Sequence, residues 1–298
     1  MSRFSGILPA VVTPLDVHGR LLESSFRALL EFLYRSPIDG VYVGGQSGEG
    51  LFLSVEERKR LTELAVECSP AEKTVIVHVG CTRVHDAIEL ARHAERSGVN
   101  ALSSLPPAGP YGFDEVLRYY TALTSATDLP FFVYHFSDYT KGVTSVAQLL
   151  RLCALPNVVG LKFTDYDLFT LSELKANGAL VYYGRDEMLS AGLLYGADGG
   201  IGTFYNLLPN TFADIYALAS RGRWEETKPL QEEVQRLIRT CSGVPMLGAI
   251  KTILGWMGIP CGPCVPPRCT LDERQEALLR KNLEESGYQA FLQPVNVA

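Results

Sequence analysis

Eight short apolar strand patterns alternate with amphipathic helical patterns in this chain of 298 residues. They predict an α/β fold, a (β/α)8 TIM barrel with a C-terminal helical extension. Repeated strand–helix alternation is typical of parallel strands joined by right-handed crossovers. The strand patterns are also almost continuously apolar, which indicates that both faces of each strand are buried, as they are between a barrel interior and its outer helices.

The expected strands are bounded by turn residues, and helical patterns separate them. We place the strands at Ile7–Thr13, Gly40–Gly44, Thr74–Val79, Ala101–Leu105, Phe131–His135, Val158–Phe163, Leu180–Tyr183 and Gly200–Phe204. The clearest helical patterns between them are Leu22–Tyr34, Val55–Cys68, Val84–Arg96, Phe113–Thr124 and Val146–Cys153. A doubly wound open sheet is the alternative, but it usually has a glycine-rich phosphate loop after its first strand, where this chain continues with Thr13-Pro14-Leu15-Asp16.

The strand pattern stops after residue 206, and only helical patterns follow. They cover Asn210–Ser220, Trp224–Thr240, Met246–Met257 and Asp272–Glu285. We expect the first of these to close the barrel and the other three to pack beside it. Since the chain has no linker-like segment, we predict one domain, with a barrel of residues 1–222 and a helical extension of residues 223–298.

Composition argues against several classes of partner. The net charge of −6 argues against nucleic acid, which binds basic surfaces. No apolar run approaches the roughly 18–20 residues that span a bilayer, and the N-terminus has no apolar signal core, so we expect a cytoplasmic protein without a membrane partner. The seven scattered cysteines are unlike a disulfide framework. Cys261-Gly-Pro-Cys264 has the spacing of a redox or zinc motif, but it lacks a second pair, and we interpret it as a turn between late helices.

One lysine interrupts a buried strand pattern and is the first candidate for chemistry. Lys162 follows the apolar run Val158–Leu161. Burial disfavours the charged form of an amine and lowers its pKa. A neutral amine attacks carbonyl groups and forms a Schiff base. The alternative interpretation is that the side chain reaches past the strand end to water.

Other polar residues are expected at the same end of the barrel, where the working residues of such folds lie. The loop Gly44–Gly50 offers backbone N–H groups and the Ser47 hydroxyl to an anion. Tyr134 lies near the end of the fifth strand, before His135, and could relay protons. Asp186 and Glu187 could bind the hydroxyl groups of a polyol. Each feature taken singly also has a structural explanation. The loop would be a tight turn, Tyr134 a packed side chain, and Asp186 and Glu187 residues of a first helical turn. Together they indicate a Schiff-base aldolase that acts on a 2-keto acid.

Five segments carry a family resemblance, and they occur in order and on the expected strands. They are Gly6–Pro14, Gly44–Gly50, Val133-Tyr134, Gly160–Asp165 and Gly199–Asn206. Through them the chain resembles the dihydrodipicolinate synthase/N-acetylneuraminate lyase family over nearly its whole length.

The resemblance implies a role for each matching residue. Lys162 matches the lysine that forms a Schiff base with pyruvate, and Tyr134 matches the tyrosine that shuttles the proton during carbon–carbon cleavage. Ser47, with the backbone around Gln46 and Gly48, falls in the loop that holds the pyruvate carboxylate.

Within the family, the sequence is closest to the sialic acid lyase branch. Gly184, Asp186 and Glu187 resemble the loop with which those lyases hold the glycerol-like hydroxyls of the open-chain sugar. Thr164 and Thr203 fall where that branch places hydroxyl side chains toward the substrate.

Three departures bear on specificity. The synthase branch carries an arginine after the catalytic tyrosine, but His135–Gly142 contains none. Compared with the lyases, the same segment lacks the usual proline and is one residue longer. Gln46 replaces a small hydroxyl residue, and its amide would donate instead. Arg185 adds a cation to the loop that contacts the sugar.

The activity implied is cleavage of N-acetylneuraminate to N-acetylmannosamine and pyruvate. No metal or other cofactor is expected, because the iminium on Lys162 withdraws the electrons. The alternatives are an aldolase for another 2-keto-3-deoxy sugar acid, a synthase-like pyruvate condensation, and a non-catalytic 2-keto acid sensor, against which the intact Lys162 and Tyr134 argue. The resemblance also implies a homotetramer, in which Tyr111 falls near a loop tyrosine that reaches toward a neighbouring subunit's site.

Overall fold

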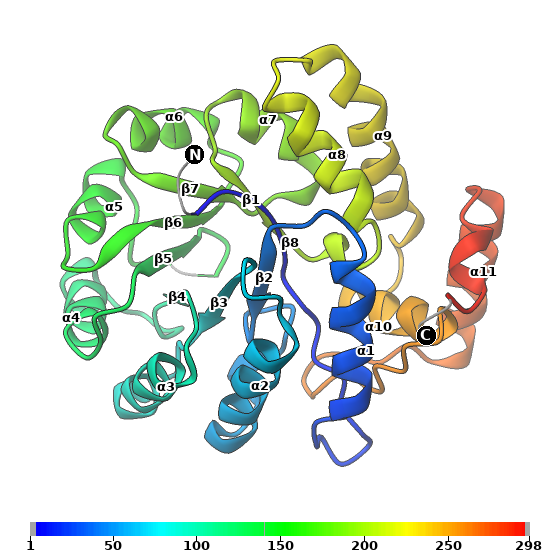
Figure 1. Ribbon diagram of the computed structural model, residues 1–298, viewed down its shortest axis with the longest axis horizontal. Coiled ribbons are helices and arrows are strands. Elements are labelled where there is room, and N and C mark those ends of the chain that lie inside the picture. Colours follow the sequence, from blue (N-terminus) through cyan, green and yellow to red (C-terminus); the bar gives the residue numbers. More distant parts are fainter. Residues whose placement is uncertain (1–3, 140, 296–298) are drawn as a thin grey trace.

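The computed structural model describes residues 4–139 and 141–295 and contains the predicted barrel (Figure 1). Eight parallel strands form one sheet in the order β1-β8-β7-β6-β5-β4-β3-β2. A bridge between Ala10 and Tyr42 joins its two edges, and the Val11 N–H donates to the Tyr42 carbonyl at 2.9 Å. Neighbouring strands are consecutive in the chain and are connected by helices, which confirms the (β/α)8 class and excludes the doubly wound alternative.

The barrel strands are short and end close to one another at the carboxyl side. They are β1 Gly6–Pro9, β2 Gly40–Val43, β3 Thr74–His78, β4 Ala101–Ser104, β5 Phe131–Phe136, β6 Val158–Thr164, β7 Leu180–Tyr183 and β8 Gly199–Gly202. The predicted first strand, Ile7–Thr13, is too long. Val11 and Val12 are buried, as their pattern suggested, but the Val12 N–H donates to the Asn206 side chain instead of a neighbouring strand. The predicted last strand also runs too far, because Phe204–Asn206 forms a helical turn.

Helices surround the strands, and most begin where the sequence predicts. They are α1 Glu23–Tyr34, α2 Val55–Cys68, α3 Val84–Ser97, α4 Phe113–Thr124, α5 Val146–Cys153, α6 Leu168–Ala176, α7 Leu189–Leu194, α8 Pro209–Ala219, α9 Trp224–Thr240, α10 Met246–Trp256 and α11 Glu273–Glu285. The start of α2 is fixed by a capping box, in which Ser54 and Glu57 satisfy each other's backbone N–H groups. The sequence patterns did not identify α6 and α7, which are only nine and six residues long.

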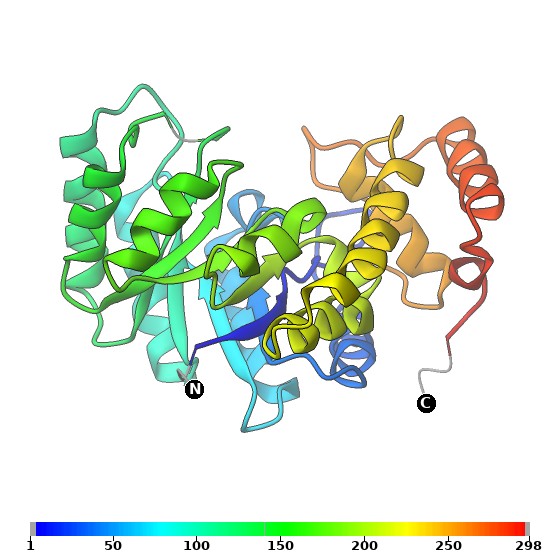
Figure 2. The same ribbon diagram turned by 90° about the horizontal axis from the view of Figure 1, so that it is seen from above.

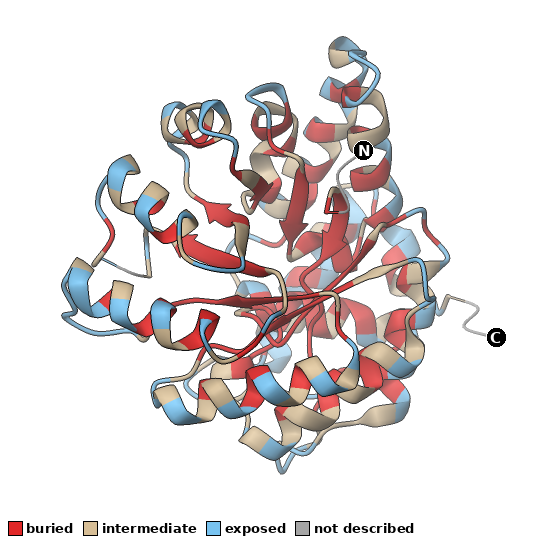
Figure 3. Cartoon of the chain, turned by 60° about the vertical axis from the view of Figure 1, so that its left-hand side comes forward, coloured by how far each residue is buried: buried red, intermediate tan, exposed pale blue. Residues whose placement is uncertain are grey.

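Two apolar layers hold the barrel together. Inside it, buried side chains from alternate positions of the strands meet, among them Leu8, Tyr42, Phe132 and Tyr182. Outside it, the opposite faces of the strands pack against the helices. Figure 3 shows this layering as buried strands surrounded by helices that are buried only on their inner sides.

The late helices gather at one side of the barrel, where Figure 2 shows them in yellow to red. The first, α8, packs against α9 and β1, and α9, α10 and α11 lie further out. No helix among the described residues is long and apolar enough to cross a bilayer. Cys261 and Cys264 lie between α10 and α11, and both are buried free thiols. Burial raises the pKa of Cys261 to about 12 and that of Cys264 to about 11.

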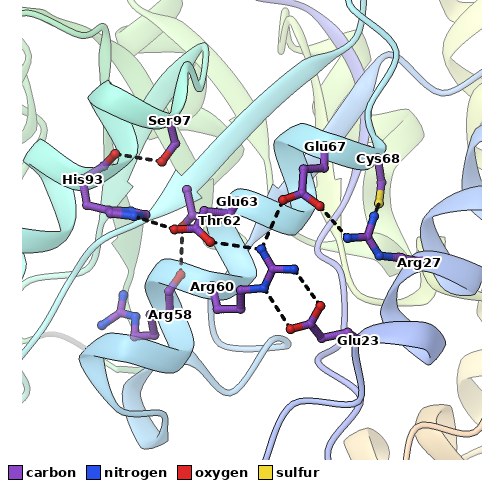
Figure 4. Close-up of polar contacts among 10 residues, drawn as sticks. All are labelled: Glu23, Arg27, Arg58, Arg60, Thr62, Glu63, Glu67, Cys68, His93 and Ser97. Carbon is purple, nitrogen blue, oxygen red and sulfur yellow. Dashed lines mark hydrogen bonds and ion pairs between the residues drawn. The ribbon is translucent and has the colours of Figure 1, made fainter.

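A charged network ties the first three helices together on the outside of the barrel (Figure 4). Arg60 of α2 bridges Glu23 of α1 and the carboxylates of Glu63 and Glu67 on its own helix. Glu63 also contacts His93 of α3 at 3.1 Å. These side chains are partly exposed to solvent, so the network connects neighbouring helices at the surface rather than forming a buried site.

Candidate active site

Lys162 lies inside the barrel near its carboxyl end and is 4% exposed. It stands in β6, paired in register with Tyr134 of β5 and Tyr182 of β7. Its Nζ atom lies 4.4 Å from the ring centroids of both Tyr42 and Tyr134. Burial lowers the pKa of Lys162 to about 7, and the Asp186 carboxylate partly opposes this shift. A large fraction of the amine is therefore neutral near pH 7, as a Schiff-base nucleophile must be.

Tyr134 supplies a buried hydroxyl beside this amine. Burial raises the pKa of its phenol above the ordinary value, while the Thr164 hydroxyl and the positive charge of Arg185 oppose the shift. The ring stacks against Phe136, with the two planes 7° apart. The hydroxyl of Tyr134 is thus a group that could donate a proton, and a positive charge formed on the Lys162 nitrogen would make it a better proton acceptor too.

One cavity of about 690 Å³ opens over these two residues at the carboxyl ends of the strands. It brings together nine of the residues predicted from the sequence: Gln46, Ser47, Tyr134, Lys162, Thr164, Gly184, Asp186, Glu187 and Thr203. The volume is in the range of small-molecule sites, and polar groups face one another across an otherwise apolar lining.

The other two predicted residues do not line this cavity. Gly48 lies behind its wall, where its carbonyl accepts a hydrogen bond of 2.6 Å from the Thr13 hydroxyl. Tyr111 is 38% exposed and lines a separate cavity of about 380 Å³ with Thr82 and Tyr119.

The loop after β2 is tightly folded, which explains its glycines. Gly44 has φ +69°, and a Cβ at Gly50 would lie 1.9 Å from the Gly44 carbonyl oxygen. This folding brings the Ser47 hydroxyl to 2.6 Å from the hydroxyl of Thr203, which follows β8. Within the pair, one hydroxyl donates and the other accepts. The accepting hydroxyl keeps its own O–H free to donate to a ligand.

Asp186 is a buried carboxylate that lines the cavity beside the end of β8. Its Oδ2 accepts a hydrogen bond of 2.7 Å from the Phe204 N–H. Burial raises the pKa of Asp186 to about 7, although the hydrogen bond from Phe204 lowers it. Helix α9 supports the backbone here, because the Gln231 and Gln235 side chains donate to the carbonyls of Asp186 and Glu187.

The charge of Arg185 is already compensated within the chain. Its guanidinium contacts Asp138 at 2.7 Å and lies 4.0 Å from the centroid of the Tyr166 ring. The Tyr166 hydroxyl in turn donates to Glu187 at 2.5 Å. Arg185 therefore fixes the rim of the cavity, and it offers an acidic substrate group less attraction than its sequence position suggests.

Sequence reasoning missed several residues of this site, among them Tyr42 beside Lys162 and Arg268. Tyr42 was recoverable, because its position in the expected strand Gly40–Gly44 leaves it facing the barrel interior. Arg268 lines the cavity from the segment between α10 and α11, where no local pattern marks it. The described residues contain no group of three metal-ligating side chains. The Cys261–Cys264 segment lies between two late helices, as predicted, but it is irregular chain rather than a turn.

Comparisons with known proteins agree with this geometry. The model of the dihydrodipicolinate synthetase family matches residues 3–286. An N-acetylneuraminate lyase of Rhizobium meliloti (strain 1021) is 37% identical over 283 residues, covering 94% of each chain. One from Escherichia coli (strain SMS-3-5 / SECEC) is 32% identical over 95% of this chain and 98% of its own. A sialic acid aldolase of Ruminococcus gnavus has a TM-score of 0.91 and 25% identity, over 96% of this chain and 98% of that one.

Proposed function

The chain belongs to the dihydrodipicolinate synthetase family, and we propose that it is a carbon–carbon lyase that cleaves N-acetylneuraminate to N-acetylmannosamine and pyruvate. The observation that carries the chemistry is the buried Lys162 amine, 4.4 Å from the Tyr134 ring in a cavity that also contains Asp186. The relatives named N-acetylneuraminate lyase support the choice of substrate.

In the proposed reaction, the neutral Nζ of Lys162 attacks the C2 ketone of the open-chain sugar acid. Loss of water leaves a positively charged iminium, which serves as the electron sink. Tyr134 gives its proton to the departing water, and the phenolate left beside the iminium then accepts the proton of the C4 hydroxyl while the C3–C4 bond breaks. The bonding electrons pass to the iminium to form an enamine. The aldehyde departs, the enamine is protonated at C3, and hydrolysis of the iminium releases pyruvate.

The remaining side chains are proposed to bind the substrate. Ser47 and the backbone from Gln46 to Gly48 would hold the carboxylate, because this loop offers hydroxyl and amide donors beside Lys162. Asp186 and Glu187 would accept hydrogen bonds from the sugar hydroxyls.

Three further residues complete the proposed polyol side. Thr164 and Thr203 would exchange hydrogen bonds with the sugar. Gly184 leaves room for this arrangement, since a Cβ there would lie 2.0 Å from the Thr164 hydroxyl.

We also propose a cytoplasmic homotetramer. The seven free thiols support a reducing compartment. Tyr111 supports assembly, because it is an exposed aromatic residue outside the cavity of its own chain and would serve the site of a neighbouring subunit. Size-exclusion chromatography with light scattering tests the assembly, and a monomer at micromolar concentration would contradict it.

Borohydride trapping tests the function. Incubation with pyruvate and borohydride should leave a reduced adduct on Lys162, identified by peptide mass spectrometry, and the Lys162→Ala variant should show none. N-acetylneuraminate should then be cleaved with a higher kcat/KM than a 2-keto-3-deoxy acid without the N-acetyl group. Absence of an adduct in the folded protein would contradict the chemistry, whereas preference for the second substrate would contradict only the choice of sugar.

A further inference from the structure

Gln46 and Arg268 meet at the wall of the cavity, although 222 residues separate them in the sequence. The Arg268 Nη2 donates to the Gln46 Oε1 at 2.8 Å, and both residues line the cavity. A guanidinium has donors only, so it can bind the amide through its oxygen alone. The contact therefore determines which way the amide faces and leaves the Gln46 NH₂ group as a donor for something else.

Two donors of this pair have no acceptor within the described chain. The Gln46 Nε2 and the Arg268 Nε are both buried, and neither has a hydrogen-bond partner among the described residues. Buried donors are nearly always satisfied, so each indicates an acceptor that the described part of the protein does not supply. The described residues also place no carboxylate within 4.0 Å of the Arg268 guanidinium. Unsatisfied donors beside an uncompensated cation favour an anionic ligand.

A buried ion pair holds the two residues in place. Glu49, in the same loop as Gln46, contacts the Lys251 ammonium at 2.5 Å, and its other oxygen accepts a hydrogen bond of 2.7 Å from the Val265 N–H. Lys251 also donates to the Pro263 carbonyl at 2.8 Å. The segment that carries Arg268 is thereby attached to the loop that carries Gln46, so their contact is built into the fold.

We propose that Arg268 is a positioning residue, which orients the Gln46 amide so that its NH₂ group donates to the carboxylate of the 2-keto acid. This inference rests on the proposed function, because it needs a substrate carboxylate beside Ser47. The small hydroxyl side chain that is usual at this position has no amide to orient. A glutamine can present either its oxygen or its nitrogen, and its oxygen would repel the substrate, so the substitution requires a partner such as Arg268.

The test compares trapping by pyruvate with trapping by acetone, a neutral ketone without a carboxylate. The variants are Arg268→Met, Gln46→Met, the double variant, and Gln46→Glu, which keeps the contact with Arg268 but removes the NH₂ donor. Arg268→Met should raise the half-saturating pyruvate concentration roughly tenfold, the scale of a hydrogen bond to a charged group, with the maximal trapping rate within about twofold of wild type. Gln46→Glu should raise it further, and acetone trapping should be almost unchanged in all four variants.

The double variant decides whether Arg268 acts through Gln46. If it does, adding Arg268→Met to Gln46→Met should change the half-saturating pyruvate concentration less than twofold. Three outcomes would overturn the inference while leaving the proposed lyase activity intact. The first is a double variant in which the two single effects on the half-saturating pyruvate concentration multiply. The others are an equal loss of trapping with acetone and an unchanged half-saturating pyruvate concentration in Arg268→Met. Wild-type protein without any pyruvate adduct would overturn the proposed function, and the inference with it. Thermal unfolding checks that each variant is folded. If Arg268→Met is not folded, Gln46→Glu still tests the NH₂ donor, and an unchanged half-saturating pyruvate concentration in that variant would overturn the inference.

Discussion

Glu49 and Lys251 form an ion pair of 2.5 Å with almost no exposure to solvent, and it joins the loop after β2 to helix α10. The pair connects the barrel to its helical extension at the edge of the candidate site. Its partners make further hydrogen bonds to the backbone at Pro263 and Val265. Such satisfaction is what a buried pair of charges needs to offset its loss of hydration.

Removal of one partner from this pair should be costly. Lys251→Met leaves the Glu49 carboxylate buried without its counter-charge, and we expect a loss of about 3–5 kcal/mol in the free energy of unfolding. Chemical denaturation measures it. The matched control is Lys281→Met, whose exposed pair with Glu285 should contribute almost nothing. Equal effects of the two variants would show that the buried pair is not important for stability.

Lys162 should be irreplaceable by another cation. Lys162→Arg keeps a basic side chain in the barrel, but a guanidinium stays protonated and forms no Schiff base. We expect no trapped pyruvate adduct and a fall in kcat of at least about a thousandfold, measured by the release of pyruvate from N-acetylneuraminate. Near-normal turnover in this folded variant would contradict the Schiff-base mechanism.

The packing of Gly202 against Asp186 predicts a specific defect. A Cβ at Gly202 would lie 1.9 Å from the Asp186 Oδ1, so Gly202→Ala should displace the carboxylate from the Phe204 N–H. We expect a raised KM for the sugar acid and a loss of about 1–3 kcal/mol in stability. Gly255→Ala is the control, since no heavy atom lies within 4 Å of its added Cβ and alanine favours the helix. It should leave KM unchanged; a similar rise in both variants would refute the steric argument.

The rate of adduct formation should depend on pH through Lys162. Only the neutral amine attacks pyruvate, and burial lowers the pKa of this group to about 7, so the rate should rise with pH to a plateau above that value. The negative charge of Asp186 raises the pKa of Lys162, and Asp186→Asn should therefore move the midpoint to lower pH. Stopped-flow trapping over pH 5–9 measures the shift. A midpoint that moves to higher pH in Asp186→Asn would contradict this coupling.

The sequence by itself determined the barrel and the centre of its chemistry. The alternation of apolar strand patterns with amphipathic helical patterns shows which segments are buried strands. In a barrel the carboxyl ends of all strands lie at the same end. Lys162, Tyr134 and Asp186 each follow or end a strand pattern, so their convergence followed from local patterns. The family resemblance added the assignment of roles, but the convergence itself needed only the topology.

Only the tertiary structure decided the contacts between distant segments. The first strand pattern stops pairing with its neighbours at Val12, where the Asn206 side chain accepts the N–H instead. Arg268 reaches Gln46 because Glu49 and Lys251 hold two segments together. Local periodicity does not predict such pairs, because it depends on residues a few positions apart. These contacts form only when the barrel closes and the extension packs against it.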